Sequence, residues 1–271
     1  MKFRNLLLGI ICMVARATFA QNDSKEYYTP KSLILPLHDE KNQLHMSLGR
    51  GGGFDLNLSY TFTDKLAVFT TASYDIGSKT RVTILGSQYK IEKNDYCIKG
   101  GLGYFTKVDN KILEVYLGGG STKIDNYWYF RGYPEGGEAT QARYNTLFVQ
   151  CNSGTKRLQS DFAVGIRISY SVYTDFRFSS TDPNAKYIKS RYENLKGISA
   201  DPVISYSYKL KRIKLNAQAG FAFPLTKNSA TRVTEHTTNY GTTIVTSQDN
   251  IALSAILGRL SAQYNLSLKK R

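Results

Sequence analysis

Strict alternation of apolar and polar positions runs through residues 161–172, which read D-F-A-V-G-I-R-I-S-Y-S-V. Every second residue from Phe162 to Val172 is apolar, and those between are mostly small or polar. A period of two predicts a β-strand with one apolar and one polar face. An ordinary strand has about 5–6 residues, whereas a strand that crosses a bilayer on a tilted path needs about 9–11. The stretch therefore predicts a transmembrane β-strand.

Similar segments recur along the chain and predict a barrel of about ten strands. Short polar turns follow the second, fourth, sixth and eighth segments, and long loops follow the third, fifth, seventh and ninth. Transmembrane barrels combine short periplasmic turns with long extracellular loops, so the fold class is all-β, a single antiparallel transmembrane β-barrel. The segment at 81–91 can extend the barrel wall beyond the membrane. The predicted strands are residues 43–49, 54–62, 66–74, 95–105, 112–121, 144–153, 161–172, 198–209, 213–223 and 251–268.

The N-terminus has the features of a signal peptide. Lys2 and Arg4 precede an apolar core at residues 6–15, and Ala20 offers a small residue for cleavage. Beyond it no apolar run approaches the roughly 20 residues of a membrane-spanning helix, which leaves a closed barrel as the membrane-compatible fold. We expect a signal peptide at 1–20, a periplasmic N-terminal segment at 21–42 and an outer-membrane barrel at 43–271, located in the cell outer membrane.

The formal net charge of +15 favours anionic partners. The lysines are scattered through turns and loops, and an exported chain does not normally meet a genome, so nucleic acid is not expected as a partner. The expected partners are outer-membrane lipids and lipopolysaccharide, with the barrel assembly machinery during biogenesis.

Strand parity places a set of charged side chains in the barrel lumen. Interior charges are unfavourable unless they are paired, and each half of the predicted lumen contains both acidic and basic side chains. The pattern therefore predicts ion pairs that fill the lumen rather than a pore. A conduit for a small solute is the alternative. Parity also places Cys97 in the lumen and Cys151 toward lipid, so no disulfide is expected. The predicted lumen charges, which are also the candidate ligand-binding residues, are Asp55, Lys99, Glu114, Asp161, Arg167, Lys214 and Arg259.

A second candidate ligand site is a predicted outer loop with aromatic residues beside an arginine. Such a group can stack on sugars or peptides, or pack on itself. Its residues are Tyr127, Trp128, Tyr129 and Arg131.

Catalysis and metal binding have little support in the sequence. His38, His45 and His236 show no metal-ligand spacing, and we expect no metal and no cofactor. A barrel hydrolase or acyltransferase needs a histidine with a carboxylate or hydroxyl near the outer rim, and only His236 with Glu235 fits. A solvated loop pair is the simpler interpretation, so no enzyme is expected.

The chain contains the segments Gly101-Leu102-Gly103-Tyr104-Phe105, Tyr144-Asn145, residues 148–154, Phe162 through Tyr170, and Asp201-Pro202. These segments resemble the outer-membrane β-barrel proteins of Bacteroidota, whose members are largely uncharacterised. The resemblance loosely covers residues 43–224 and implies location and fold rather than activity. The chain departs from the pattern at its end, where Leu268 precedes only basic residues and no terminal aromatic residue follows.

The predicted function is a structural or ligand- and surface-binding role in the outer membrane. The alternatives are a small-solute channel, a barrel enzyme acting on envelope lipids, and a secreted soluble β protein.

Overall fold

The structure is a computed structural model that describes residues 28–268 apart from 52, 83–87, 131, 183–185, 212, 227, 239 and 252. The predicted signal peptide lies outside the described residues. Within them no helix is long and apolar enough to cross a membrane. The strands are β1 (Gln43–Arg50), β2 (Phe54–Thr61), β3 (Leu66–Val82), β4 (Gln88–Val108), β5 (Lys111–Phe130), β6 (Tyr133–Lys156), β7 (Ser160–Asp182), β8 (Lys186–Glu193), β9 (Lys196–Leu210), β10 (Ile213–Pro224), β11 (Asn228–Thr238), β12 (Gly241–Ile251) and β13 (Ala255–Ser267).

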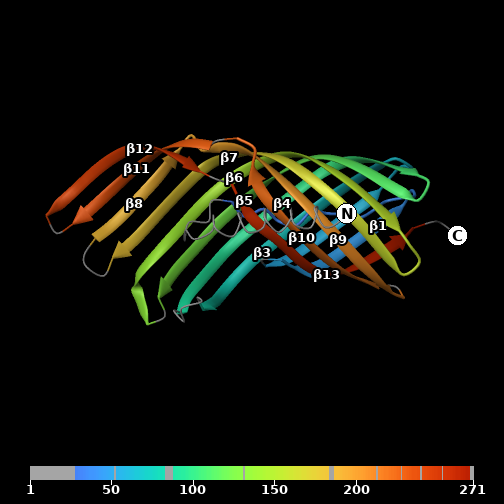
Figure 1. The fold of residues 1–271 in the computed structure, drawn as a ribbon, viewed down its shortest axis with the longest axis horizontal. Coiled ribbons are helices and arrows are strands. Elements are labelled where there is room, and N and C mark those ends of the chain that lie inside the picture. Colours follow the sequence, from blue (N-terminus) through green and yellow to red (C-terminus); the bar gives the residue numbers. More distant parts are fainter. Residues whose placement is uncertain are drawn as a thin grey trace, which may run out of the picture.

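Ten of these strands close into an antiparallel barrel (Figure 1). Strands β1 to β7 pair in sequence order, β7 continues to β9, and β10 and β13 complete the circuit back to β1. The predicted all-β antiparallel barrel is confirmed, including the strand at 161–172, which lies within β7.

The predicted long loops are wrong over most of their length, because they continue the barrel wall as strands. β5 and β6 extend into the loop expected at 122–143, and β3 and β4 lengthen as the segment at 81–91 suggested. β8 pairs with β7, β11 with β8 and β12 with β11, and these strands form the left-hand end of Figure 1. The strand expected at 251–268 corresponds to β13 at 255–267, and Ile251 is the last residue of β12. The outward faces of these outer segments carry mostly polar residues, while their inward faces, apart from that of β12, are buried, for example at Ile124, Phe176 and Tyr192. The sequence there therefore has no lipid-facing apolar row to mark it.

The two ends of the barrel differ in how far the strands extend beyond the apolar belt. The β2–β3, β4–β5, β6–β7 and β9–β10 connections all lie at one end and are short, as predicted. We call this the short-turn end, and the opposite end, with β8, β11 and β12, the extended end. At the extended end the β1–β2 hairpin turns back first, because β1 and β2 have 8 residues each whereas β3 to β7 have 17–24. The wall beyond this hairpin therefore has no hydrogen-bonded strand between the free edge of β12 and that of β3.

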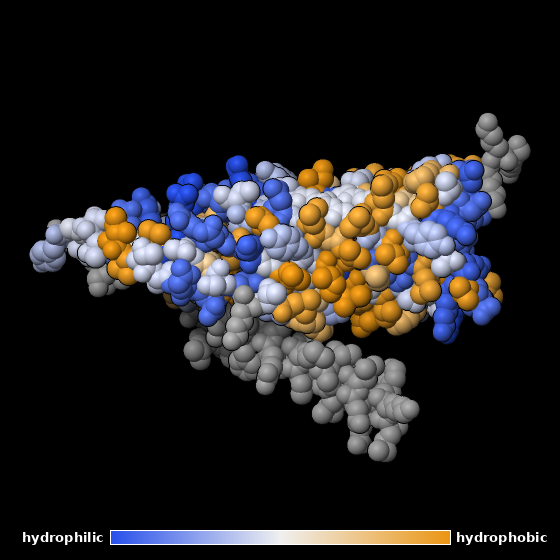
Figure 2. Space-filling model, turned by 90° about the horizontal axis from the view of Figure 1, so that it is seen from above, coloured by the Kyte–Doolittle hydropathy of each residue, from blue (hydrophilic) through white to orange (hydrophobic). Residues whose placement is uncertain are grey.

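The outward faces of the barrel strands carry a belt of exposed apolar side chains. On β7, for example, Phe162, Val164 and Ile166 are all about 40–50% exposed. Figure 2 shows hydrophobic residues gathered in a band over the barrel, with hydrophilic residues at the right-hand end and a mixed surface toward the extended end on the left. Such a band is the surface that a hydrocarbon layer covers. The predicted parity of the two thiols is also confirmed, since Cys97 is buried, Cys151 is exposed and both are free.

Three aromatic rings in the lumen lie over glycines of neighbouring strands. A Cβ on Gly103 would lie 2.2 Å from the Tyr116 ring, one on Gly118 would lie 2.6 Å from Phe148, and one on Gly101 would lie 2.8 Å from Phe69. Edge-to-face contact between Phe69 and Tyr116, with centroids 5.1 Å apart, joins two of the rings. The glycine-rich runs at 100–103 and 118–120 therefore make room for aromatic packing inside the barrel.

Candidate functional site

The lumen is occupied by the chain's own N-terminal region. We call residues 28–39 the lumen segment. Residues 28–38 are buried almost throughout and have no regular secondary structure. The periplasmic placement predicted for 21–42 is thus wrong for these residues, which lie inside the barrel. The sequence signal was the apolar run Leu33-Ile34-Leu35, followed by Leu37, because it is too apolar for a solvated segment.

Apolar contacts hold the middle of the lumen segment. Leu33, Leu35 and Leu37 form one buried cluster with side chains of β5, β7, β9 and β13. Ile34 belongs to a second cluster, together with the aromatic residues that lie over the glycines. Each fully buried leucine or isoleucine contributes about 1.5–3 kcal/mol relative to exposure, so transfer of this run into water is strongly unfavourable.

Lumen side chains also satisfy the backbone of the segment. Gln150 and Asn152 both donate to the carbonyl of Ile34, at 2.7 and 3.1 Å. Near the short-turn end, Glu114 accepts a hydrogen bond from the backbone N–H of His38 at 2.7 Å. These bonds provide the partners that an irregular buried backbone requires.

At its other end the lumen segment meets a buried ion pair. Arg167 lies 3.0 Å from Asp201, both side chains are almost fully buried, and Arg167 also donates to the carbonyl of Lys31 at 2.8 Å. Tyr28 accepts from Ser199 at 3.0 Å beside the same carboxylate. Asp201 was not among the predicted lumen charges, although the parity of its strand would have placed it inside.

The other predicted lumen charges also face the interior. Asp55 lies 3.5 Å from Arg259, and Lys214 donates to Asp161 at 2.6 Å. Lys99 is buried, with Arg167 and Asp201 as its charged neighbours. Two ion pairs, Asp55–Arg259 and Asp161–Lys214, therefore join residues that were both predicted to lie in the lumen. Arg167 instead pairs with Asp201, which was not predicted.

An ion pair closes the short-turn end. Lys156 donates to Asp39 at 2.6 Å, and Gln43 donates to the same carboxylate at 2.9 Å. Burial by itself would raise the pKa of Asp39, but the hydrogen bond and charge of Lys156, with the Gln43 bond, outweigh it and hold the pKa below 3.8. Asp39 is therefore ionised at neutral pH and fixes the point where the chain leaves the lumen.

The predicted loop aromatics lie on the outer part of β5 rather than in a loop, and Arg131 lies outside the described residues. Successive strand residues face opposite sides, so Tyr127 and Tyr129 share one face, with ring centroids 5.3 Å apart, and Trp128 points to the other. Tyr129 donates to Glu92 at 2.9 Å, and Lys90 lies 3.3 Å from that carboxylate. Hydrogen bonds from Tyr129 and Lys90 lower the pKa of Glu92.

The candidate catalytic pair is separated by strand geometry. Glu235 and His236 are neighbours on β11, so their side chains leave opposite faces of the sheet. Glu235 is therefore not placed to orient the imidazole of His236. Among the described residues no group of three histidine, cysteine or acidic side chains is arranged to hold a metal ion.

Comparison with solved structures supports the architecture. The outer membrane protease OmpT of Escherichia coli superposes with a TM-score of 0.51 at 8% identity, over 83% of this chain and 94% of that one. The fold is that of an outer-membrane β-barrel. A major outer membrane protein of Thermus thermophilus matches at a TM-score of 0.38 and 15% identity, over 83% of this chain and 98% of that one. No protein-family model and no curated protein sequence match the chain.

Proposed function

We propose that this chain is an outer-membrane protein with a closed barrel and a structural or surface-binding role, not a transport role. The observation that carries the proposal is the lumen segment. Leu33 and Ile34 are at most 2% exposed inside the barrel. One end of the segment is held by the hydrogen bond from Arg167 to the Lys31 carbonyl, and the other by the Lys156–Asp39 ion pair. A solute would have to displace these contacts together.

The extended end is the proposed working surface. Strands β3 to β8, β11 and β12 rise beyond the β1–β2 hairpin and project a sheet away from the apolar belt. Tyr127 and Tyr129 lie on it beside charged side chains, an arrangement suited to sugars or peptides. The role proposed for these residues is contact with a ligand or surface, and no catalytic step is assigned to the chain.

Location and partners follow from the same proposal. The predicted signal peptide, the apolar belt and the barrel fold support export to the outer membrane of a Gram-negative cell, with Bacteroidota as the proposed group. The short-turn end then faces the periplasm and the extended end faces the outside. The proposed partners are outer-membrane lipids, lipopolysaccharide and, during insertion, the barrel assembly machinery.

Conductance in planar lipid bilayers tests the closed barrel. The mature protein is expected to insert without discrete conductance steps, whereas a variant lacking residues 28–36 is expected to conduct, because removal of that stretch leaves a water-accessible lumen. A heat-modifiable gel shift checks that both proteins are folded. Discrete, reproducible steps from the mature protein would refute the proposal and favour the small-solute channel.

A further inference from the structure

A rung of cross-strand partners with aromatic and basic side chains runs from the tip of the β1–β2 hairpin across the outer face of the barrel. Arg50 pairs with Phe54, Phe54 with Tyr74, and Tyr74 with Tyr96 across β1 to β4. The next partner, on β5, is Lys123, whose ammonium group lies 5.9 Å from the Tyr96 ring. Aromatic side chains at the end of the apolar belt of a barrel mark the border between hydrocarbon and lipid headgroups.

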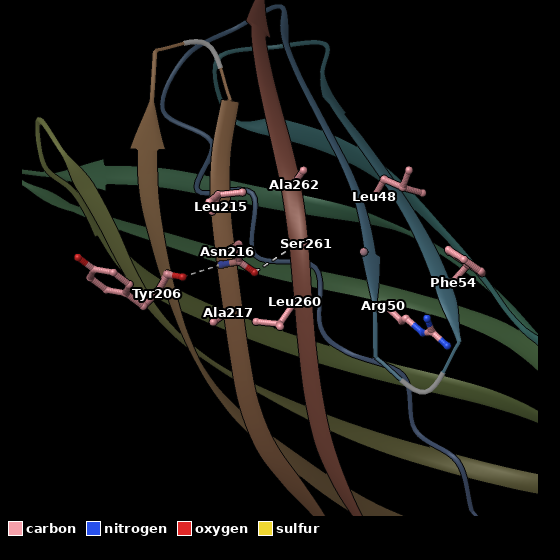
Figure 3. A pocket seen from close by; sticks show the side chains of 11 residues that line it. Leu48, Arg50, Phe54, Tyr206, Leu215, Asn216, Ala217, Leu260, Ser261 and Ala262 are labelled. Atoms are coloured by element: carbon pink, nitrogen blue, oxygen red, sulfur yellow. Dashed lines mark hydrogen bonds between the residues drawn. The ribbon is translucent and has the colours of Figure 1, made fainter. Parts of the chain in front are cut away.

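Two apolar grooves on the outer wall lie at this rung, one on each side of the hairpin. The first has a volume of about 560 Å³ and crosses β9, β10, β13 and β1 (Figure 3). Its low floor comes from Ala217 and Ala262, and Leu48 and Phe54 rise at its edge. The second has a volume of about 470 Å³, crosses β1 to β4 and is also lined by Leu48 and Phe54. The two residues thus form a ridge between adjacent grooves.

Arg50 is the cation at this ridge. Figure 3 shows it at the end of β1, next to the hairpin turn and between Leu260 and Phe54. Its guanidinium lies 5.7 Å from the Phe54 ring, and no carboxylate of the described residues pairs with it. Lys123 on the same rung differs, because Asp125 lies 3.2 Å from its ammonium group. An arginine with free donors at headgroup level is suited to bidentate binding of a phosphate.

We infer that the β1–β2 hairpin is the binding site for one phosphorylated, multiply acylated glycolipid of the lipid A type. Arg50 binds a phosphate of the headgroup, and acyl chains lie in the grooves on either side of the ridge formed by Leu48 and Phe54. The paired grooves favour a lipid with several chains, and the single cation favours an anionic headgroup. This inference rests on the proposed membrane location but not on the closed lumen.

Native mass spectrometry of the detergent-solubilised protein tests the site. The delipidated protein is titrated with lipid A and, separately, with phosphatidylglycerol, and the bound fraction is measured. Lipid A is expected to bind more tightly than phosphatidylglycerol. Arg50→Ala is expected to weaken lipid A binding about tenfold or more, the usual effect of losing a charge-assisted contact, while Arg50→Lys retains part of it. Ala262→Leu, which fills the first groove from the lipid side, is expected to weaken it as well.

Lys65→Ala is the matched control, because Lys65 is an exposed cation in the β2–β3 turn at the opposite end. It should bind lipid A like the unaltered protein, and the gel shift should show every variant folded. The inference would be overturned if the Arg50→Ala variant bound lipid A as tightly as the unaltered protein does, or if phosphatidylglycerol bound as tightly as lipid A. Protein dimers whose interface covers the grooves in place of lipid would overturn it too. Since the assay measures binding alone, a conducting barrel that still binds lipid A refutes only the closed lumen.

Discussion

Removal of Asp201 should destabilise the barrel far more than removal of the whole Arg167–Asp201 pair. Asp201 is fully buried and Arg167 is nearly so, which leaves Arg167 as an uncompensated interior charge in the Asp201→Leu variant. Breaking a buried pair from one side costs about 3–5 kcal/mol. When Arg167→Met is added the stranded charge disappears, and the main remaining loss is the hydrogen bond to the Lys31 carbonyl, about 1 kcal/mol.

Urea unfolding in detergent micelles measures this difference, with fluorescence of the single tryptophan and the gel shift as independent probes. The double variant should lose at least about 2 kcal/mol less than the Asp201→Leu variant. An exposed pair provides the control: Asp175 lies 2.9 Å from Arg177, whose side chain is 63% exposed, so Asp175→Leu should cost less than about 1 kcal/mol. If the two lumen substitutions add independently, the charges are not coupled and the account of the lumen fails.

Three further predictions concern local features. Gly103→Ala should lower the free energy of unfolding by about 1–3 kcal/mol, because the new methyl group meets an aromatic ring, whereas Gly258→Ala, with nothing within 4 Å, should be nearly neutral in the same urea assay. The pKa of Asp39 is lowered in the folded protein, so its ion pair stabilises the fold above pH 3.8. The free energy of unfolding of the Asp39→Asn variant should be lower than that of the unaltered protein by at most about 1 kcal/mol there, and this difference should shrink as the pH falls below 3.8. Cys97 and Cys151 should both be alkylated when the mature protein is unfolded without reductant, which the intact mass measures. A mass that lacks either of these two adducts would contradict free thiols.

The sequence by itself determined the barrel, because lipid forces a period of two wherever one face of a strand meets hydrocarbon. The segment from Phe162 to Val172 was recognisable for that reason, and its parity placed Arg167 inside correctly. The parity of the strand now seen as β4 did the same for Cys97. The short polar turns marked one end correctly, since hairpins there need only a few polar residues, whereas most of the length expected as loops at the other end is strand. Where the outward face of a strand is polar, as in β8 and β11, or both faces are exposed, as in β12, this constraint disappears, and the sequence pattern did not reveal the strands.

Only the tertiary structure decided what fills the lumen. Leu33 to Leu37 is a short apolar run without periodicity, and its burial depends on contacts with strands more than a hundred residues away, such as the bonds from Gln150 and Asn152. The partner of Arg167 likewise depends on the register between β7 and β9, which sets Arg167 opposite Asp201. Register and through-space contacts are long-range properties, so the pattern along the chain determined which side chains point inward, and the closed fold determined what each one meets there.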